Sequence, residues 1–390
     1  MTLNASGPIS LAGSTTGQSI AVELGLGATT AISLNQAAVR TLAGIASGAI
    51  IMPTNFWGKS SGQSVIAMAT SQLGGAGIIA YPWSAGFGTK YADPSPFIVS
   101  PSSCVAFNPA GTVIAIGGQT TPYIFAYPWS AGFGTKYADP SPLPAGFANV
   151  FGVAFNPAGT AIAVARSNSP YIDAYAWSSG FSTKYADPSP AAGGNGWGVT
   201  FNPAGTVIAL ARASTPFVDA FAWSAGFGTK YANPSSPPAG PNEARSVAFN
   251  PAGTAIALAS ASSTYIYVYP WSAGFGTKYA DPASLPPAQC LSVAFNPAGT
   301  AIALATTSSP FIIVYPWSAG FGTKYANPAS LPTIGLGVAF NPAGTVIALS
   351  SASSPRIHAY VWSSGFGTKY ANPASLPAAG TSGITFNNVV

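Results

Sequence analysis

One segment occurs seven times in this chain, and this repetition constrains the fold more than any other feature. The copies read as variants of WSAGFGTKYADP and follow one another at intervals of 45 to 48 residues. Periods of roughly 20–50 residues are typical of chains that stack one supersecondary unit many times. The copies begin at Trp83, Trp129, Trp177, Trp223, Trp271, Trp317 and Trp362.

Each repeat unit contains four short segments of strand-forming sequence. In residues 246–282 these are SVAFN, TAIALAS, TYIYVYPW and GTKYA, all rich in β-branched and aromatic residues. NPAG, between the first two, has the residue order of a type I turn, and the glycines of SAGFG suit a tight turn between the last two. No segment of the unit has a helical period. The unit is therefore predicted to be four antiparallel strands, which we call a, b, c and d.

The two ends of the repeat region are incomplete in complementary ways. The first unit lacks strand a and starts with SVIAMAT at residues 64–70, whereas the chain ends with a seventh strand a, GITFNN, at residues 383–388. A single blade cannot bury its faces, so blades stack until a ring closes. Residues 62–390 are therefore predicted to form an all-β domain, a seven-bladed β-propeller of four-stranded antiparallel blades. Its C-terminal strand is expected to complete the first blade.

Two parts of the unit match a known repeat pattern. VAFNPAGTAIALA stands in the place of v-x-F-S-P-D-G-x-x-L-A, and YVYPW in the place of I-x-V-W-D. On these residues the unit resembles a WD-repeat-type propeller blade over residues 64–390. The His of the Gly-His signature and the Asp of the Trp-Asp signature are missing, so the hydrogen bonds of those residues are not expected here. The resemblance implies a non-enzymatic interaction scaffold.

Residues 1–61 lie outside the repeat and are predicted to form a small N-terminal α+β module. GPISLAGST and QSIAVELGLG have strand-like sequences, and residues 34–44 have that of a short helix ended by Gly. AAVRTLAG, ASGAI and FWGKS follow in that order, and with these features residues 32–62 resemble a small N-terminal module of bacteriophage virion proteins, often tail-associated. The resemblance implies a joining piece, so we interpret residues 1–61 as a virion-attachment module. The alternative is a cap over one face of the propeller.

Composition excludes several classes of protein. Only 5% of the residues are charged, against about 25% in a typical soluble protein. The longest apolar stretch, residues 42–53, is too short to span a bilayer, and the N-terminus lacks the basic and apolar parts of a signal peptide. The lysines are spread around the repeat rather than clustered as in nucleic-acid-binding proteins. We therefore expect a soluble protein without membrane insertion or a nucleic-acid partner, with Cys104 and Cys290 as isolated thiols.

The sequence offers little material for catalysis. His358 is the single histidine and occupies an ordinary strand position. An acidic residue recurs in KYADP but alternates with Asn, which indicates an Asx turn that ends strand d rather than a catalytic carboxylate. No residues have metal-ligand spacing and no Gly-rich loop opens a helix. We therefore predict no enzyme, no catalytic residue, no metal and no cofactor. The alternating positions are Asp93, Asp139, Asp187, Asn233, Asp281, Asn327 and Asn372.

Two neighbouring b–c hairpins carry matched charges. Arg166 and Asp173 occupy one hairpin, and Arg212 and Asp219 take the same positions in the next. Charges that appear together in one hairpin predict cross-strand ion pairs, which contribute about 1 kcal/mol or less when exposed. The alternative is that they form two adjacent polar subsites for a ligand.

The loops on the two faces of the predicted ring differ in how much they vary. The a–b turns are NPAGT in all complete copies and the c–d turns are nearly identical, whereas every d–a and b–c loop is different. We therefore predict that partners bind the face of the d–a and b–c loops, called here the variable face. An alternative is that Phe151, Trp197, Leu291 and Leu336 only plug the channel mouth. The candidate partner-binding residues are Phe147, Phe151, Trp197, Glu243, Arg245, Leu291, Leu336, Arg166, Arg212 and Arg356.

These observations favour a phage virion structural protein, tail- or fibre-associated, that is assembled in the host cytoplasm. Residues 1–61 would bind other virion proteins, and the variable face would bind a host surface receptor, a glycan or a virion neighbour. One alternative is a multivalent carbohydrate-binding lectin with the repeated Trp, Lys and Tyr as equivalent sites. Another is a cellular scaffold propeller. The copied segments themselves are interpreted as structural, with the seven Trp side chains packing between blades.

Overall fold

The protein is described by a computed structural model over residues 19–25, 37–43, 64–71, 76–96, 98, 100–144, 146, 149–238 and 243–387. The chain divides into two compact units, Met1–Ser64 with Val389–Val390, and Val65–Asn388. None of the helices in these described ranges is long and apolar enough to cross a membrane.

The described part of the first unit holds two short helices, α1 (Ile20–Glu23) and α2 (Ala37–Ala43). Helix α2 lies within the predicted helix at residues 34–44. The strand predicted from QSIAVELGLG is wrong, because α1 occupies this place. The N–H groups of Glu23 and Leu24 donate to the carbonyls of Ser19 and Ile20, four residues earlier. These bonds between residues four apart define a helix, although Ile and Val favour strands. The predicted strand GPISLAGST lies outside the described residues.

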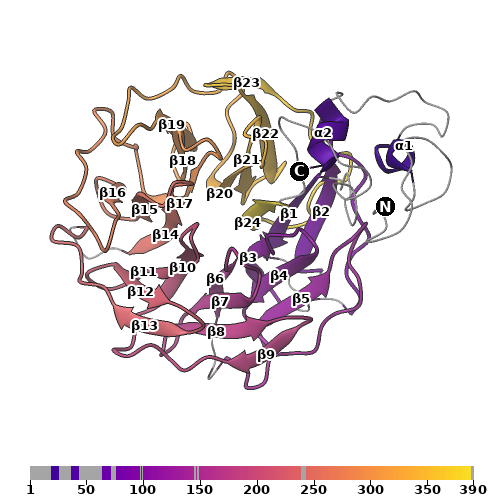
Figure 1. The fold of residues 1–390 in the computed structure, drawn as a ribbon. Coiled ribbons are helices and arrows are strands. Elements are labelled where there is room, and N and C mark those ends of the chain that lie inside the picture. Colours follow the sequence, from indigo (N-terminus) through magenta and orange to yellow (C-terminus); the bar gives the residue numbers. More distant parts are fainter. Residues whose placement is uncertain are drawn as a thin grey trace. The chain divides into compact units, whose positions relative to one another are not determined.

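The second unit is a ring of seven antiparallel sheets, one per blade (Figure 1). The innermost strands a are β24 (Thr381–Phe386), β3 (Ser102–Phe107), β6 (Val150–Phe155), β10 (Gly196–Phe201), β14 (Ala244–Phe249), β17 (Cys290–Phe295) and β20 (Gly335–Phe340). Strands b are β1 (Ser64–Thr70), β4 (Val113–Gly118), β7 (Ala161–Arg166), β11 (Val207–Arg212), β15 (Ala255–Ser260), β18 (Ala301–Thr306) and β21 (Val346–Ser351). Strands c are β2 (Ile78–Trp83), β5 (Ile124–Pro128), β8 (Ile172–Trp177), β12 (Val218–Trp223), β16 (Ile266–Pro270), β19 (Ile312–Pro316) and β22 (Ile357–Trp362). We number the blades 1 to 7 in this order.

The C-terminal strand closes the ring, as predicted. Strand β24 pairs with β1 in an antiparallel register that places Phe386 opposite Ile66. Beyond it, the Asn387 side chain accepts a hydrogen bond from the Val65 N–H at 2.8 Å. In blade 2 the Asn108 side chain accepts bonds from the N–H groups of Thr112 and Val113 in the same way. Asn387 therefore repeats, from the far end of the chain, the bond that each NPAGT turn makes within its own blade.

Strand d is shorter than predicted in most blades. It forms as β9 (Phe181–Lys184), β13 (Phe227–Lys230) and β23 (Phe366–Lys369), whereas the other four blades keep a single Trp–Phe bridge. The cause lies in strand c, where a proline lacks the N–H that the ladder needs. Blades with strand d have Ala176, Ala222 or Val361 before the Trp. Blades with only the bridge have Pro82, Pro128, Pro270 or Pro316.

The copied segments form the contacts between blades. Trp129, directly after strand c of blade 2, is 4% exposed and meets three rings edge-on. The ring centroids of Phe133 and Phe107, in its own blade, lie 4.9 and 5.5 Å away, and that of Tyr91, in the preceding blade, lies 5.0 Å away. Such edge-to-face pairs contribute about 0.5–1.5 kcal/mol each beyond burial. The same arrangement joins blade 7 to blade 1 through Trp83, Tyr370, Phe87 and Phe386.

A second contact between blades comes from the tyrosines near the end of strand c. The Tyr127 hydroxyl donates to the Pro96 carbonyl in the preceding d–a loop at 3.0 Å, and Tyr315 donates to Ser284 at 2.6 Å. Tyr81 donates to Ser375 at 2.6 Å and so links blade 1 to the loop that leaves blade 7. These bonds tie strand c of one blade to the d–a loop that leaves the preceding blade.

Candidate functional site

The two sets of variable loops are bonded to each other. The N–H of Ser167, in a b–c loop, donates to the carbonyl of Asn149 in the adjoining d–a loop at 3.0 Å, and Ala213 donates to Asn195 at 2.8 Å. On the other face, the Trp129 N–H at the start of the c–d turn donates to Thr112 in the a–b turn at 2.7 Å. The ring therefore has one face of individual loops and one face of nearly identical turns, as the sequence predicts.

A β-bulge interrupts the innermost strand of every blade near the variable face. In β10, for example, Gly196 lies opposite Arg212 and Gly198 opposite Ala211, so Trp197 is the extra residue between them. Bulges redirect a side chain and are frequent beside functional sites. The bulge residues together line one cavity of about 250 Å³ at the channel mouth. They are Ser103, Phe151, Trp197, Arg245, Leu291, Leu336 and Ser382.

Directly after the bulge residue, the innermost strands of neighbouring blades approach each other closely. A Cβ atom on Gly152 would lie 3.0 Å from the Gly198 Cα, and one on Gly383 would lie 2.8 Å from the Cys104 Cα. Only small side chains fit between the two strands at this position. The next level is aliphatic and nearly uniform. Its lining residues are Val105, Val153, Val199, Val247 and Ile384.

One sector of the mouth is an aromatic and ionic stack. The rings of Phe151 and Trp197 lie 4.3 Å apart with planes tilted by 34°. The Arg245 guanidinium carbon lies 4.1 Å from the Trp197 ring centroid, and Arg245 Nη2 lies 2.7 Å from Glu243 Oε2. Guanidinium–indole contacts of this kind contribute about 0.5–2 kcal/mol. The other sector is aliphatic or hydroxylic, so the mouth has no rotational symmetry although the blades do.

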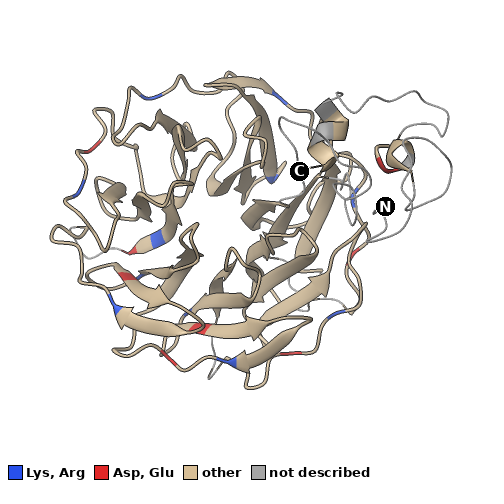
Figure 2. Cartoon of the chain, viewed as in Figure 1, with Lys and Arg blue, Asp and Glu red and all other residues tan. Residues whose placement is uncertain are grey.

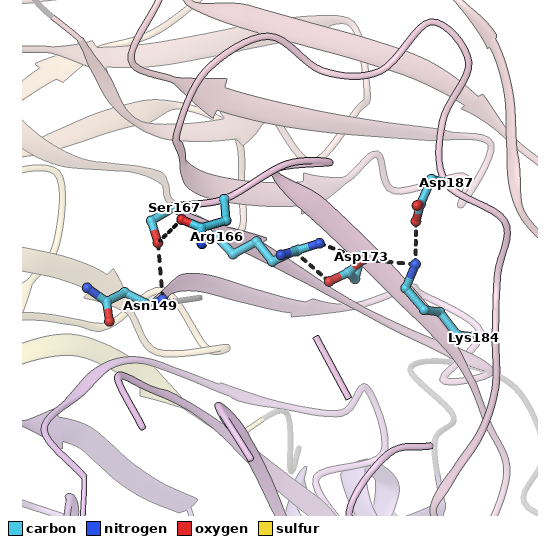
Figure 3. Close-up of polar contacts among 7 residues, drawn as sticks. Asn149, Arg166, Ser167, Asp173, Lys184 and Asp187 are labelled. Atoms are coloured by element: carbon cyan, nitrogen blue, oxygen red, sulfur yellow. Dashed lines mark hydrogen bonds and ion pairs between the residues drawn. The ribbon is translucent and has the colours of Figure 1, made fainter. Parts of the chain in front are cut away.

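Both predicted ion pairs form, but they are buried. The side chains of Arg166 and Asp173 point toward each other (Figure 3). Arg166 Nε lies 2.6 Å from Asp173 Oδ2, and both side chains are fully buried. Arg212 Nε lies 2.8 Å from Asp219 Oδ2. The low energy expected of an exposed pair therefore does not apply, since removing one partner of a buried pair costs about 3–5 kcal/mol.

Each ion pair has a third member that was not predicted from the sequence. Lys184 Nζ lies 3.0 Å from Asp173 Oδ1, and Lys230 Nζ lies 2.6 Å from Asp219 Oδ1. The lysine comes from strand d, which pairs with strand c in the sheet. Because a lysine recurs at this position in every unit, the sequence did contain a sign that it could reach the aspartate. Burial raises the pKa of Asp173, and the neighbouring Arg166 and Lys184 act in the opposite direction.

The partner-binding role predicted for Arg166 and Arg212 is wrong. The Arg166 side chain is fully buried and that of Arg212 is 5% exposed, because both turn inward to a buried carboxylate. Arg356 is half-buried, and its Nη1 donates to the Pro377 carbonyl at 2.6 Å. Phe147 lies outside the described residues. The cavity thus brings together Phe151, Trp197, Arg245, Leu291 and Leu336, with Glu243 paired to Arg245.

In every blade except blade 4, the repeated Asp or Asn bonds a lysine, whereas a bond to nearby backbone was predicted. Asp93 Oδ1 lies 2.6 Å from Lys90 Nζ, three residues earlier. Asn327 accepts from Lys324 at 2.6 Å, and Asn372 accepts from Lys369 at 2.9 Å. Asp and Asn both offer the side-chain oxygen that this bond requires, which explains why they alternate. Figure 2 shows these charges spread around the ring rather than gathered in a stripe.

The remaining titratable groups are held in unreactive settings. Within the described ranges, no three His, Cys, Asp or Glu residues are grouped so that they could hold a metal ion. Burial raises the pKa of Cys104 to about 12 and also raises the pKa of Cys290. His358 is 3% exposed, and burial, with a smaller effect of Lys369, lowers its pKa to about 4. These thiols and this imidazole are therefore neutral near pH 7.

Comparisons with known proteins show the fold alone. No family model matches the chain, and no curated protein sequence matches it. A Bacteroides uniformis protein provisionally assigned as a 6-phosphogluconolactonase has a TM-score of 0.63 at 14% identity, over 83% of this chain and 99% of that one. The periplasmic gluconolactonase of Pseudomonas aeruginosa has a TM-score of 0.63 at 12% identity, over 84% and 99%. Kuenenia stuttgartiensis hydrazine synthase has a TM-score of 0.52 at 12% identity, over 72% and 80%.

Proposed function

We propose that this chain is a non-enzymatic virion component, tail- or fibre-associated, whose propeller binds a protein partner through the variable face. The observation that carries the proposal is the asymmetric channel mouth, where the seven bulge positions hold five different residue types and line one cavity. Binding of one partner explains why the bulge positions differ between blades, while the residues that pack one blade against the next are the same in each unit. The virion assignment rests on the resemblance of residues 32–62 to a phage attachment module.

A protein partner fits the variable face better than a set of repeated sugar sites. The seven copied Trp side chains are only 4–5% exposed and pack against Phe and Tyr rings, so they offer no free face for a sugar. Trp197 lies between Phe151 and Arg245. The exposed large hydrophobic side chains of the described chain are aliphatic and belong to d–a loops, a setting that suits protein contacts. They are Leu285, Leu331, Ile334 and Leu376.

The fold likeness to lactonases favours no second function by itself, because the same fold also occurs in hydrazine synthase. A phosphorylated lactone carries a doubly charged group, which proteins hold with several cations or with a bidentate Arg. Arg245 is the single cationic residue that lines the described cavity, and it is already paired with Glu243. We therefore propose that the mouth binds without catalysing a reaction.

The test is to express the labelled full chain during phage infection and to look for it in purified virions. We expect the chain in purified virions, labelled at a tail or fibre, and we expect a chain lacking residues 1–61 to keep its β-sheet circular dichroism but to be absent from particles. A matched variant with Trp197→Ala should still be incorporated while losing attachment to host cells. Normal incorporation without residues 1–61 would contradict the attachment role.

Two further assays separate the rival functions. Hydrolysis of 6-phosphogluconolactone by the wild-type chain, lost on Arg245→Ala, would overturn the non-enzymatic assignment. A glycan array with titration stoichiometry would detect the lectin alternative, because several equivalent sugars per chain are incompatible with a single asymmetric mouth.

A further inference from the structure

The loop that leads into Trp197 packs directly on its neighbours. It comprises residues 191–196, AAGGNG. A Cβ atom on Gly194 would lie 2.3 Å from the Ser214 side-chain oxygen, and one on Gly196 would lie 2.5 Å from the Tyr171 carbonyl oxygen. Gly194 also has a φ of +90°, which other residues rarely adopt. The loop is therefore glycine-rich because it lies against the b–c loops of blades 3 and 4.

The buried charges of blade 4 bind both backbone polar groups of one loop residue, Gly193. Arg212 Nη1 donates a hydrogen bond to the Gly193 carbonyl, and the Gly193 N–H donates to Asp219 Oδ2 at 3.4 Å. Arg212 Nη2 donates to the Thr215 carbonyl at 3.0 Å, which ties the same guanidinium to the b–c loop. The planar fork of Arg can reach the carboxylate and both carbonyls at once, whereas an ammonium group cannot.

The charge chain continues to the outer edge of the blade. Lys230 Nζ on β13 lies 2.6 Å from Asp219 Oδ1, while Asp219 Oδ2 faces Arg212. The carboxylate is thus fixed between two cations, and its remaining bond goes to Gly193. Asp219 therefore joins strand d of blade 4, through Lys230, to the loop of residues 191–196, through Gly193.

We propose that Arg212 and Asp219 are positioning residues that set the place of Trp197 in the channel mouth. Gly193 is four residues before Trp197, and Asn195 between them accepts a bond from Ala213. The whole approach to the bulge is therefore fixed on blade 4. The two residues act through the loop and do not touch the partner. Their effect on partner binding rests on the proposed function, whereas their effect on the loop does not.

The chain itself supplies the replacement pair for a test. Blade 6 has Thr306 and Ile313 at the positions of Arg212 and Asp219, so Arg212→Thr with Asp219→Ile installs a pair that already folds in this ring. Lys230 can then bond Asn233, as Lys324 bonds Asn327 in blade 6. The matched control is Arg166→Thr with Asp173→Ile, which removes the same buried charges one blade earlier.

The readouts are hydrogen exchange of residues 193–197 and the fluorine NMR signal of 5-fluorotryptophan at position 197, assigned with Trp197→Phe. We expect exchange roughly 30-fold faster in the blade 4 variant, from the loss of charge-assisted bonds to Gly193. The signal of position 197 should shift in this variant. Neither change should occur in the control. Arg212→Lys, which keeps a cation beside Asp219, should also release the loop.

Equal changes in the two double variants would overturn the proposal, because they would indicate a general loss of stability. An unchanged loop in the blade 4 variant would overturn it as well. If the loop is released but attachment to host cells is unaffected, the positioning role stands and the proposed role of the mouth fails. The two claims are therefore tested separately.

Discussion

Replacing His358 tests how much the burial of this histidine makes the stability of the protein depend on pH. His358 lies in β22, and its Nε2 lies 3.3 Å from the Thr333 N–H and from the Thr333 hydroxyl. Burial, with a smaller effect of Lys369, lowers its pKa from 6.5 to about 4. The folded protein thus favours the neutral ring, whereas the unfolded chain binds a proton below about pH 6.5. The stabilisation is complete above pH 6.5 and is lost as the pH falls towards 4.

The size of this loss follows from the two pKa values. Each pKa unit corresponds to about 1.36 kcal/mol, so the full contribution is roughly 3 kcal/mol, and about 2.5 kcal/mol of it is lost by pH 4.5. Carboxyl groups also titrate in this range, so wild type must be compared with a variant. His358→Ile is suitable because blade 6 has Ile313 at the same position.

The assay is urea unfolding of both proteins at pH 7.5 and pH 4.5. We expect the wild type to lose about 2.5 kcal/mol more than His358→Ile between the two values. Equal losses would refute the reasoning, since they would mean that His358 is protonated in the folded protein as readily as in the unfolded chain. Unequal m-values would instead indicate that the variant has changed the surface exposed on unfolding.

Three further predictions concern the ring. Tyr315→Phe should cost about 1 kcal/mol of unfolding free energy by removing the bond to Ser284, while Tyr175→Phe, whose hydroxyl has no hydrogen-bond partner in the described structure, should cost nothing in the same urea assay. Ala176→Pro should abolish amide protection in β9, because it installs the proline of the bridge-only blades, and hydrogen exchange that stays slow there would contradict this. Asn387→Ala should cost about 1–3 kcal/mol and expose the Val65 amide to exchange; an unchanged Val65 rate would mean that Asn387 does not hold the closure.

The ring and its closure could be predicted from the sequence because they follow from the number of repeat units and the number of strands in each. A missing strand a in the first unit and an extra one at the C-terminus leave one way to complete seven blades. The length of strand d was also within reach, since the proline or its replacement before each Trp determines it. The strand predicted where α1 lies was wrong because a stretch of a few residues is too short to distinguish the helical period of 3.6 residues from the strand period of 2.

The channel mouth was only partly predictable. Its seven positions could be found by aligning the units with one another, but the sequence does not show that each is the extra residue of a bulge. The burial of Arg166 and Arg212 was hidden for a different reason. Both end strand b, next to a loop, where a charged side chain is usually exposed, and only the assembled sheet places a carboxylate and a lysine around them.

The pattern of identity and variation in this chain follows the contacts that each position makes. The Trp, Phe and Tyr of a copied segment each touch a ring in the same or the next blade, so a change at one of them alters the joint between two blades. A bulge residue faces the shared cavity and can differ in every blade without disturbing a joint. Aromatic and charged residues occupy the bulges of blades 3 to 5, with leucines in blades 6 and 7 and serines in blades 1 and 2. This order gives the mouth one orientation, which argues for a single partner placed one way rather than for seven equivalent ligands.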